Sequence, residues 1–222
     1  MAGIATTPVT KVDTDMFVEP NAAPISELPI VEVIARIERL NNGLASFWGD
    51  SQGWAPIAAA ELLSKSRLDW QASLSASLRL WIRDDPNALT PGELILAWAN
   101  LGSLLEGTVK TLLSVYYETY RADLEHLKKA NAFDKNKQEA KPPDGLALEH
   151  LRLYCKSRQL LGAEGDALVE HVQSRRNAIH AFKDRPIGNG VEFQLALRAY
   201  LGLLRAVNDR LPYPDDVYAP HE

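Results

Sequence analysis

The residues best suited to chemistry lie close together between Arg175 and His180. This stretch holds two guanidinium groups, the carboxamide of Asn177 and an imidazole. Arginine keeps a fixed positive charge, and its planar fork of N–H donors matches a phosphate group. Histidine titrates near neutral pH and can take up or release a proton during a reaction. Together these residue types favour anion binding combined with proton transfer.

Helical spacing separates the two arginines. Arg176 and His180 are four residues apart and share a helix face, with Asn177 one turn before His180. Arg175 falls instead within an apolar stripe typical of a core-facing surface. That stripe comprises Leu168, Val172, Ile179 and Phe182. A guanidinium there needs an acidic partner or must extend to solvent, because an unpaired buried charge is costly. The alternative interpretation is structural: these cations complement the dipole at a helix C-terminus.

The order of arginine, polar residue, several further residues and histidine, late in a helical chain, resembles the signature of the HEPN superfamily. Members of that superfamily are small helical bundles. Many are metal-independent RNases of toxin–antitoxin and phage-defence systems, and others are nucleotide-binding or scaffolding modules. The usual pattern has four to six residues between Arg and His. Arg175 precedes His180 by four intervening residues but is followed by Arg176, whereas Arg176 is followed by Asn177 with only three. The resemblance therefore leaves open which arginine is functional.

The resemblance implies a metal-independent endoribonuclease acting on RNA phosphodiesters. Either Arg175 or Arg176 would hold the phosphate, His180 would transfer a proton, and Asn177 would orient the His ring or the phosphate. No metal and no cofactor is expected. The alternative is a non-catalytic HEPN-like module that binds a nucleotide or a protein.

Three further residues are candidates for substrate binding. Lys183 and Arg185 follow the motif directly and are expected to guide the RNA backbone towards it. Glu106 stands among apolar neighbours. It is expected either to pair with Arg175 or to act as a carboxylate of the site. The resemblance also implies a homodimer, with a nucleotidyltransferase-like antitoxin as a partner. The apolar residues Ala97, Trp98, Leu101, Leu104 and Leu105 make an additional interface plausible.

The composition of the chain limits the classes of protein to which it can belong. The 222 residues are 46% hydrophobic and 24% charged, which is ordinary for a globular chain. The net charge of −5 argues against a broad nucleic-acid surface, because such binding needs many phosphate contacts. The segment 152–185 nevertheless has seven Lys and Arg against four Asp and Glu. The lone Cys155 is expected in the core, and no membrane span or signal peptide is evident. A cytoplasmic location is expected.

The elements that position the motif are all predicted to be helical. Apolar residues recur at three- and four-residue spacing, and Pro and Gly mark the breaks. The sequence predicts an extended or disordered arm over 1–25 and one all-α domain over 26–222. Its HEPN-like core is expected over about 90–211, with two earlier helices packed on it as an N-terminal addition. About six helices are expected, over 26–44, 56–83, 90–130, 146–161, 163–181 and 193–211. Thr90, Pro91 and Glu93 predict a capping box at the start of the longest one.

Overall fold

The computed structural model describes residues 23–180, 184–215 and 218–222. The predicted N-terminal arm over 1–25 lies almost entirely outside the described residues, as does Lys183. The structure is 68% helix and 2% strand, so the predicted all-α class is confirmed.

The helices are shorter and more numerous than the sequence pattern predicts. The α-helices are α1 (Ile30–Trp48), α2 (Ile57–Lys65), α3 (Leu68–Ser77), α4 (Pro91–Val115), α5 (Tyr117–Ala122), α6 (Leu124–Lys129), α7 (Leu148–Ser157), α8 (Gly162–Arg176) and α9 (Gly190–Asn208). Short 3-10 turns are η2 (Leu78–Trp81), η3 (Pro86–Ala88), η4 (Pro143–Gly145) and η5 (Asn177–Ile179). Strands β1 (Phe133–Asp134) and β2 (Glu139–Ala140) form an antiparallel hairpin. Within these ranges, every helix is too short or too polar to cross a membrane.

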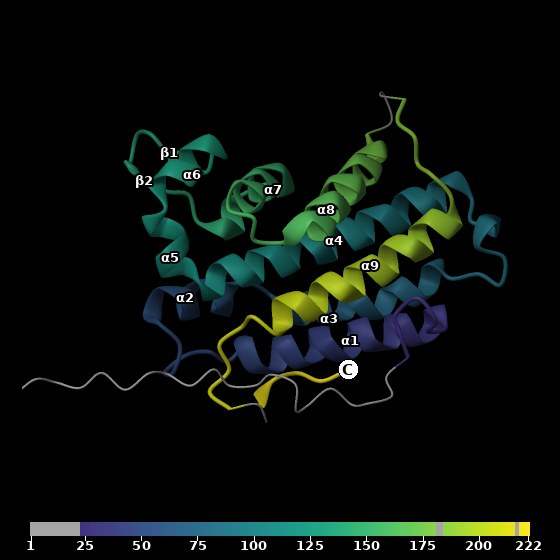
Figure 1. The fold of residues 1–222 in the computed structure, drawn as a ribbon, viewed down its shortest axis with the longest axis horizontal. Helices are drawn as coiled ribbons and strands as arrows, with labels where there is room; N and C mark the ends of the chain where they lie inside the picture. The colour runs from purple at the N-terminus through teal and green to yellow at the C-terminus, as the bar shows by residue number, and fades with distance from the viewer. Residues whose placement is uncertain (1–22, 181–183, 216–217) are drawn as a thin grey trace, which may run out of the picture.

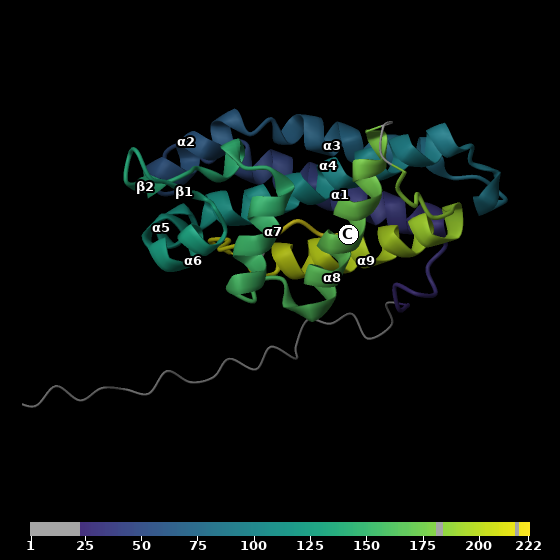
Figure 2. The same ribbon diagram turned by 90° about the horizontal axis from the view of Figure 1, so that it is seen from above.

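The central element is α4, which packs against α2, α3, α7, α8 and α9 (Figure 1). Seen from above, α2 and α3 lie on one side of α4, while α8 and α9 lie on the other (Figure 2). The predicted capping box starts this helix: Glu93 N donates to Thr90 Oγ1 over 3.3 Å, and Thr90 N donates to Glu93 Oε2 over 2.8 Å. Trp98, Leu101 and Leu105 of α4 are fully buried. A helix covered on several faces in this way forms the core of the molecule.

A buried polar network joins four of the helices. The side chain of Gln71 in α3 donates to Asn41 Oδ1 in α1 over 2.9 Å, and its Nε2 also lies 3.4 Å from Thr108 Oγ1 in α4. The hydroxyl groups of Thr108 and Tyr200 in α9 lie 3.0 Å apart. Gly107 leaves room for the Gln71 carboxamide, because a Cβ at Gly107 would overlap it. The network satisfies polar groups that would otherwise be costly to bury.

Two long helices of the prediction are interrupted. The segment predicted as one helix over 56–83 breaks at Arg67, which adopts the left-handed conformation with φ 50°. The segment predicted over 90–130 breaks at Tyr116 (φ −96°, ψ 32°) and again at Asp123. Between these two breaks, in α5, the side chain of Tyr120 is buried. Tertiary packing thus overrides local helical preference at these positions.

The segment over 131–145, which separates two of the predicted helices, is partly buried. Ala132 and Ala140 are almost fully covered, and Tyr120 Oη donates to Lys141 O over 2.7 Å. The hairpin, α5 and α6 lie at one end of the molecule in both views (Figures 1 and 2). Helix α1 packs against α3 and α9. Apolar residues of α1 belong to the same continuous core as those of α4 and α9.

Candidate functional site

The candidate motif lies at the end of a helix rather than inside one. The predicted helix over 163–181 ends at Arg176, and residues Asn177–Ile179 form one 3-10 turn. His180 follows with an extended backbone (ψ 93°). The tighter turn moves Ile179 away from the predicted apolar stripe, and its side chain is 49% exposed. His180 therefore stands at the start of the connection to α9.

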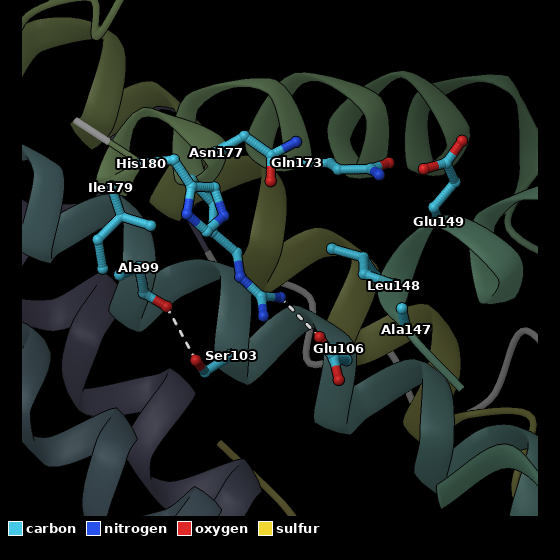
Figure 3. Close-up of a pocket in the computed structure, with 11 residues that line it drawn as sticks. Ala99, Ser103, Glu106, Ala147, Leu148, Glu149, Gln173, Asn177, Ile179 and His180 are labelled. Atoms are coloured by element: carbon cyan, nitrogen blue, oxygen red, sulfur yellow. Dashed lines mark hydrogen bonds and ion pairs between the residues drawn. The ribbon is translucent and has the colours of Figure 1, made fainter. Parts of the chain in front are cut away.

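Helices α4, α7 and α8 surround a pocket of about 530 Å³ at this place. The residues that line it are Ala99, Ser103, Glu106, Ala147, Leu148, Glu149, Gln173, Arg176, Asn177, Ile179 and His180. We call this set the Glu106 pocket. The predicted residues Arg176, Asn177, His180 and Glu106 all belong to it. Figure 3 shows Ala99, Ser103 and Glu106 on one side of the pocket and His180, Asn177 and Gln173 on the other.

The guanidinium of Arg176 is held against α4 by a carboxylate. Arg176 Nη1 donates to Glu106 Oε2 over 2.6 Å, and Lys110 Nζ donates to Glu106 Oε1 over 2.8 Å. Burial alone would raise the pKa of Glu106, but hydrogen bonds from Arg176 and Lys110 lower it below its ordinary value of 4.5. Glycine at position 102 permits this approach, because a Cβ there would lie 2.5 Å from Arg176 Cδ.

The neighbouring Arg175 points to a different set of groups, which we call the Glu192 cluster: His171, Arg175, Pro186 and Glu192. Arg175 Nε donates to Glu192 Oε1 over 2.6 Å, and its Nη1 donates to Pro186 O over 2.6 Å. His171 Nε2 lies 3.0 Å from the same Glu192 oxygen. The expected pairing of Glu106 with Arg175 is therefore wrong, because α8 turns these two arginines towards different helices.

Side chains of α8 and α4 also bind the segment just before α9. Besides the bond from Arg175 to Pro186 O, Trp98 Nε1 donates to Ile187 O over 2.8 Å. Two successive carbonyl groups are thus bound by side chains of α8 and α4. Arg185 lies just before these anchored residues and is half-buried, and it does not line the Glu106 pocket. Lys183, predicted to act with it, lies outside the described residues.

Four polar side chains of the Glu106 pocket make no hydrogen bond or ion pair to any described residue: Glu149, Gln173, Asn177 and His180. Figure 3 shows them in a row, with His180 at one end, Glu149 at the other, and Asn177 and Gln173 between them. Sequence reasoning missed Gln173 and Glu149. Gln173 could have been found, because it lies four residues before Asn177 on the same helix face. Glu149 comes from α7 and carries no such signal.

The apolar residues of α4 that were expected to form an interface are buried and present no surface to a partner. The side chains of Ala97, Trp98, Leu101, Leu104 and Leu105 are all 0% exposed inside the chain's own core. This finding removes the proposed surface and leaves the homodimer itself untested.

One other cluster of ionisable residues and the lone cysteine have structural explanations. His126 Nδ1 lies 2.7 Å from Asp123 Oδ1, and Arg158 Nε lies 2.9 Å from Asp123 Oδ2. Cys155 is fully buried, as predicted, and burial raises the pKa of its thiol to about 12. Among the residues that the structure describes, no group of three or more His, Cys, Asp and Glu side chains is arranged to hold a metal ion.

Comparison with known proteins leaves the chain without a family assignment. No protein-family model, no curated protein and no solved structure matches it. The resemblance to the HEPN superfamily therefore rests on the motif residues alone.

Proposed function

We propose that the protein is a metal-independent endoribonuclease whose site is the Glu106 pocket. The observation that carries this proposal is the convergence of Arg176, Asn177 and His180 on one pocket. Arg176 is then the arginine of the HEPN-like motif, because Arg175 is committed to the Glu192 cluster. The guanidinium of Arg176, the carboxamide of Asn177 and the exposed imidazole of His180 are together suited to binding and cleaving a phosphodiester.

The proposed reaction is an internal transesterification of RNA. The ribose 2′-oxygen attacks the adjacent phosphorus, and the bond from phosphorus to the 5′-oxygen breaks. His180 accepts the proton from the 2′-hydroxyl, and the leaving 5′-oxygen takes up a proton from water. The products are a 2′,3′-cyclic phosphate and a 5′-hydroxyl. Arg176 offsets the charge that builds up on the phosphoryl oxygens, an effect worth about 3 kcal/mol for one well-placed donor.

Glu106 has a positioning role in this proposal. Its two oxygens bind Arg176 and Lys110, so the guanidinium is fixed while its remaining N–H groups stay free for phosphate. Asn177 lies next to His180 along the row in Figure 3 and is able to orient either the imidazole or the phosphate. Arg185, with Lys183, is assigned the role of attracting the RNA backbone.

Membership of the HEPN superfamily, an HEPN-like core with α1 to α3 added to it, and a homodimer belong to the same proposal, as does a nucleotidyltransferase-like antitoxin partner. A dimer would bring two copies of the pocket into one assembly. Light scattering at tens of micromolar protein measures this directly, and a monomer mass contradicts it.

The second candidate is a non-catalytic module that binds a nucleotide or a protein. The observation that favours it is the charge balance of the pocket: Glu106 already pairs with Arg176, and Glu149 adds a second carboxylate. Under this alternative, calorimetry detects tight binding of a nucleotide while RNA stays intact.

The deciding experiment is cleavage of total RNA in excess EDTA by the wild type and by His180→Ala. We expect cleavage by the wild type, with a loss of about 10²- to 10⁴-fold in the variant, which is the usual contribution of a general acid or base. His221→Ala, which removes an exposed imidazole outside the pocket, is the control and should cleave normally. Equal cleavage by the wild type and His180→Ala refutes the proposal.

A further inference from the structure

The pocket holds a carboxylate that the cleavage chemistry does not use. Glu149 comes from the first turn of α7 and lies at the opposite end of the polar row from His180 (Figure 3). Glu106 is compensated by Arg176 and Lys110, whereas Glu149 has no basic partner among the described residues. Glu149 is exposed, so both of its carboxylate oxygens are open to hydrogen-bond donors of a ligand in the pocket.

We propose that Glu149 recognises guanine and that the Glu106 pocket selects the nucleoside supplying the 2′-hydroxyl. This inference rests on the proposed ribonuclease function and names its substrate preference. A carboxylate offers two acceptor oxygens side by side and no donor. The Watson–Crick edge of guanine offers two adjacent donors, N1–H and the 2-amino group. The two sets match as a pair of parallel hydrogen bonds.

The other bases fit a carboxylate less well. Adenine places the acceptor N1 beside its 6-amino donor, and cytosine places the acceptor N3 beside its 4-amino donor. Uracil has one donor, N3–H, flanked by two carbonyl acceptors. Each of them would set at least one lone pair against an oxygen of Glu149. Discrimination by such unpaired and repelling groups is stronger than discrimination by apolar contact.

The surroundings of Glu149 suit a base. Gln173 is its neighbour along the row in Figure 3, and its carboxamide carries a donor for guanine O6. Leu148, which precedes Glu149 in the chain, adds apolar surface to the lining. The pocket volume of about 530 Å³ lies within the range of about 300–1,000 Å³ that is usual for small-molecule sites. Single-stranded RNA is commonly read in this way, with the base splayed out and bonded on its Watson–Crick edge.

The test uses DNA oligonucleotides that contain a single ribonucleotide, so that only one position carries a 2′-hydroxyl. The ribonucleotide is guanosine, inosine, adenosine, cytidine or uridine in an otherwise identical strand. We expect the wild type to cleave at guanosine about 10-fold or more faster than at adenosine, cytidine or uridine. Inosine lacks only the 2-amino group and should fall between them. Glu149→Gln replaces one acceptor by a donor and should abolish the preference for guanosine. Glu61→Gln makes the same charge change outside the pocket and should retain it.

The outcomes separate this inference from the proposed function. Cleavage without a guanosine preference, or with a preference that survives Glu149→Gln, overturns the inference while the ribonuclease stands. If the wild type cleaves none of the strands, calorimetry with guanosine and inosine 3′-monophosphates decides. Tighter binding of the guanosine form that is lost in Glu149→Gln supports the guanine site without catalysis. Equal affinities, or no binding of either, overturn it.

Discussion

Arg175 and Arg176 are adjacent in the chain, yet their guanidinium groups differ in their partners and in their exposure to solvent. In the Glu192 cluster, Arg175 donates to Glu192 and to Pro186 O, and its side chain is 17% exposed. In the Glu106 pocket, Arg176 makes one hydrogen bond, to Glu106, and is 33% exposed. Arg175 therefore links α8 to α9 and to the segment before it. Arg176 is held by a single hydrogen bond, and its other N–H groups remain free to donate.

The difference shows how a step of one residue along a helix separates a structural side chain from a candidate catalytic one. Consecutive residues of an α-helix point about 100° apart, so α8 sends one arginine towards α9 and the next towards α4. Each meets a glutamate of the helix it faces. The partners differ in what else they bind: Glu192 also faces His171, whereas Glu106 also binds Lys110 beside an open cavity. The following predictions break or sharpen this contrast.

Removing the pocket arginine should have the largest effect on function. Arg176→Ala deletes the proposed phosphate donor, and we expect RNA cleavage to fall by about 10²- to 10³-fold. Single-turnover cleavage measures this loss, and thermal unfolding checks that the fold is intact. Arg175→Ala is the matched comparison. A larger loss of activity per folded molecule in Arg175→Ala would reverse our assignment of the motif arginine.

Removing the other arginine should act on stability. Arg175→Ala leaves Glu192 without its closest partner and frees Pro186 O, and we expect a cost of roughly 2 kcal/mol in the free energy of unfolding. Chemical denaturation measures it. Arg39→Ala, which removes an exposed pair with Glu32, should cost less than about 1 kcal/mol. Equal effects of the two substitutions would contradict the structural role of the cluster.

The stabilising effect of Glu106 should depend on pH. Its pKa is lowered in the folded state, so the folded protein binds fewer protons than the unfolded chain below the ordinary value of 4.5. The stabilisation is therefore present above pH 4.5 and is lost as pH falls through the lowered pKa. We expect Glu106→Gln to cost roughly 1.5 kcal/mol at pH 7 and much less at pH 3.

Denaturant unfolding at pH 7 and at pH 3 measures the two free energies for the wild type and Glu106→Gln. Glu61→Gln is the control, and its stability should track the wild type at both values. A Glu106→Gln deficit that is unchanged at pH 3 would show that the carboxylate charge is not what stabilises the pair.

Adding one methyl group should disturb the pocket without loosening the fold. Gly102→Ala places a Cβ 2.5 Å from Arg176 Cδ, so the guanidinium must move away from Glu106. We expect cleavage to fall about 10-fold, while the better helix propensity of alanine, worth up to about 1 kcal/mol, offsets most of the stability lost with the displaced Arg176–Glu106 pair. Gly92→Ala adds the same group where nothing lies within 4 Å, and its activity should be normal. Normal activity in both variants would show that the position of Arg176 is unimportant.

The smallest effect is expected at Arg185. It lies outside the pocket and would contribute only long-range attraction, so Arg185→Ala should weaken RNA binding about 3-fold at low salt. Filter binding at two salt concentrations measures this, and the difference should vanish at high salt. Arg121→Ala, on α5, should change nothing. A salt-independent loss in Arg185→Ala would indicate a direct contact instead.

Local features of this structure could be predicted, and long-range pairings could not. The capping box at Thr90 and the need of Arg175 for an acidic partner follow from residues within one or two helix turns. The identity of that partner does not, because Glu106 and Glu192 are both glutamates on helices that flank α8. The end of α8 at Arg176 was also missed, since Asn177, Ala178 and Ile179 are compatible with either kind of helical turn. Glu149 could not be predicted either, because it lines the pocket only as a result of how α7 packs in the fold.

The buried network of Asn41, Gln71, Thr108 and Tyr200 has a consequence for how this chain can change over time. Each of these side chains is a hydrogen-bond partner of another, so replacing one leaves a buried polar group without its partner. Single substitutions at these positions should be rejected, while concerted ones are tolerated. In any related chain the four positions are therefore expected to covary, and they would identify a relative even where the pocket residues have diverged.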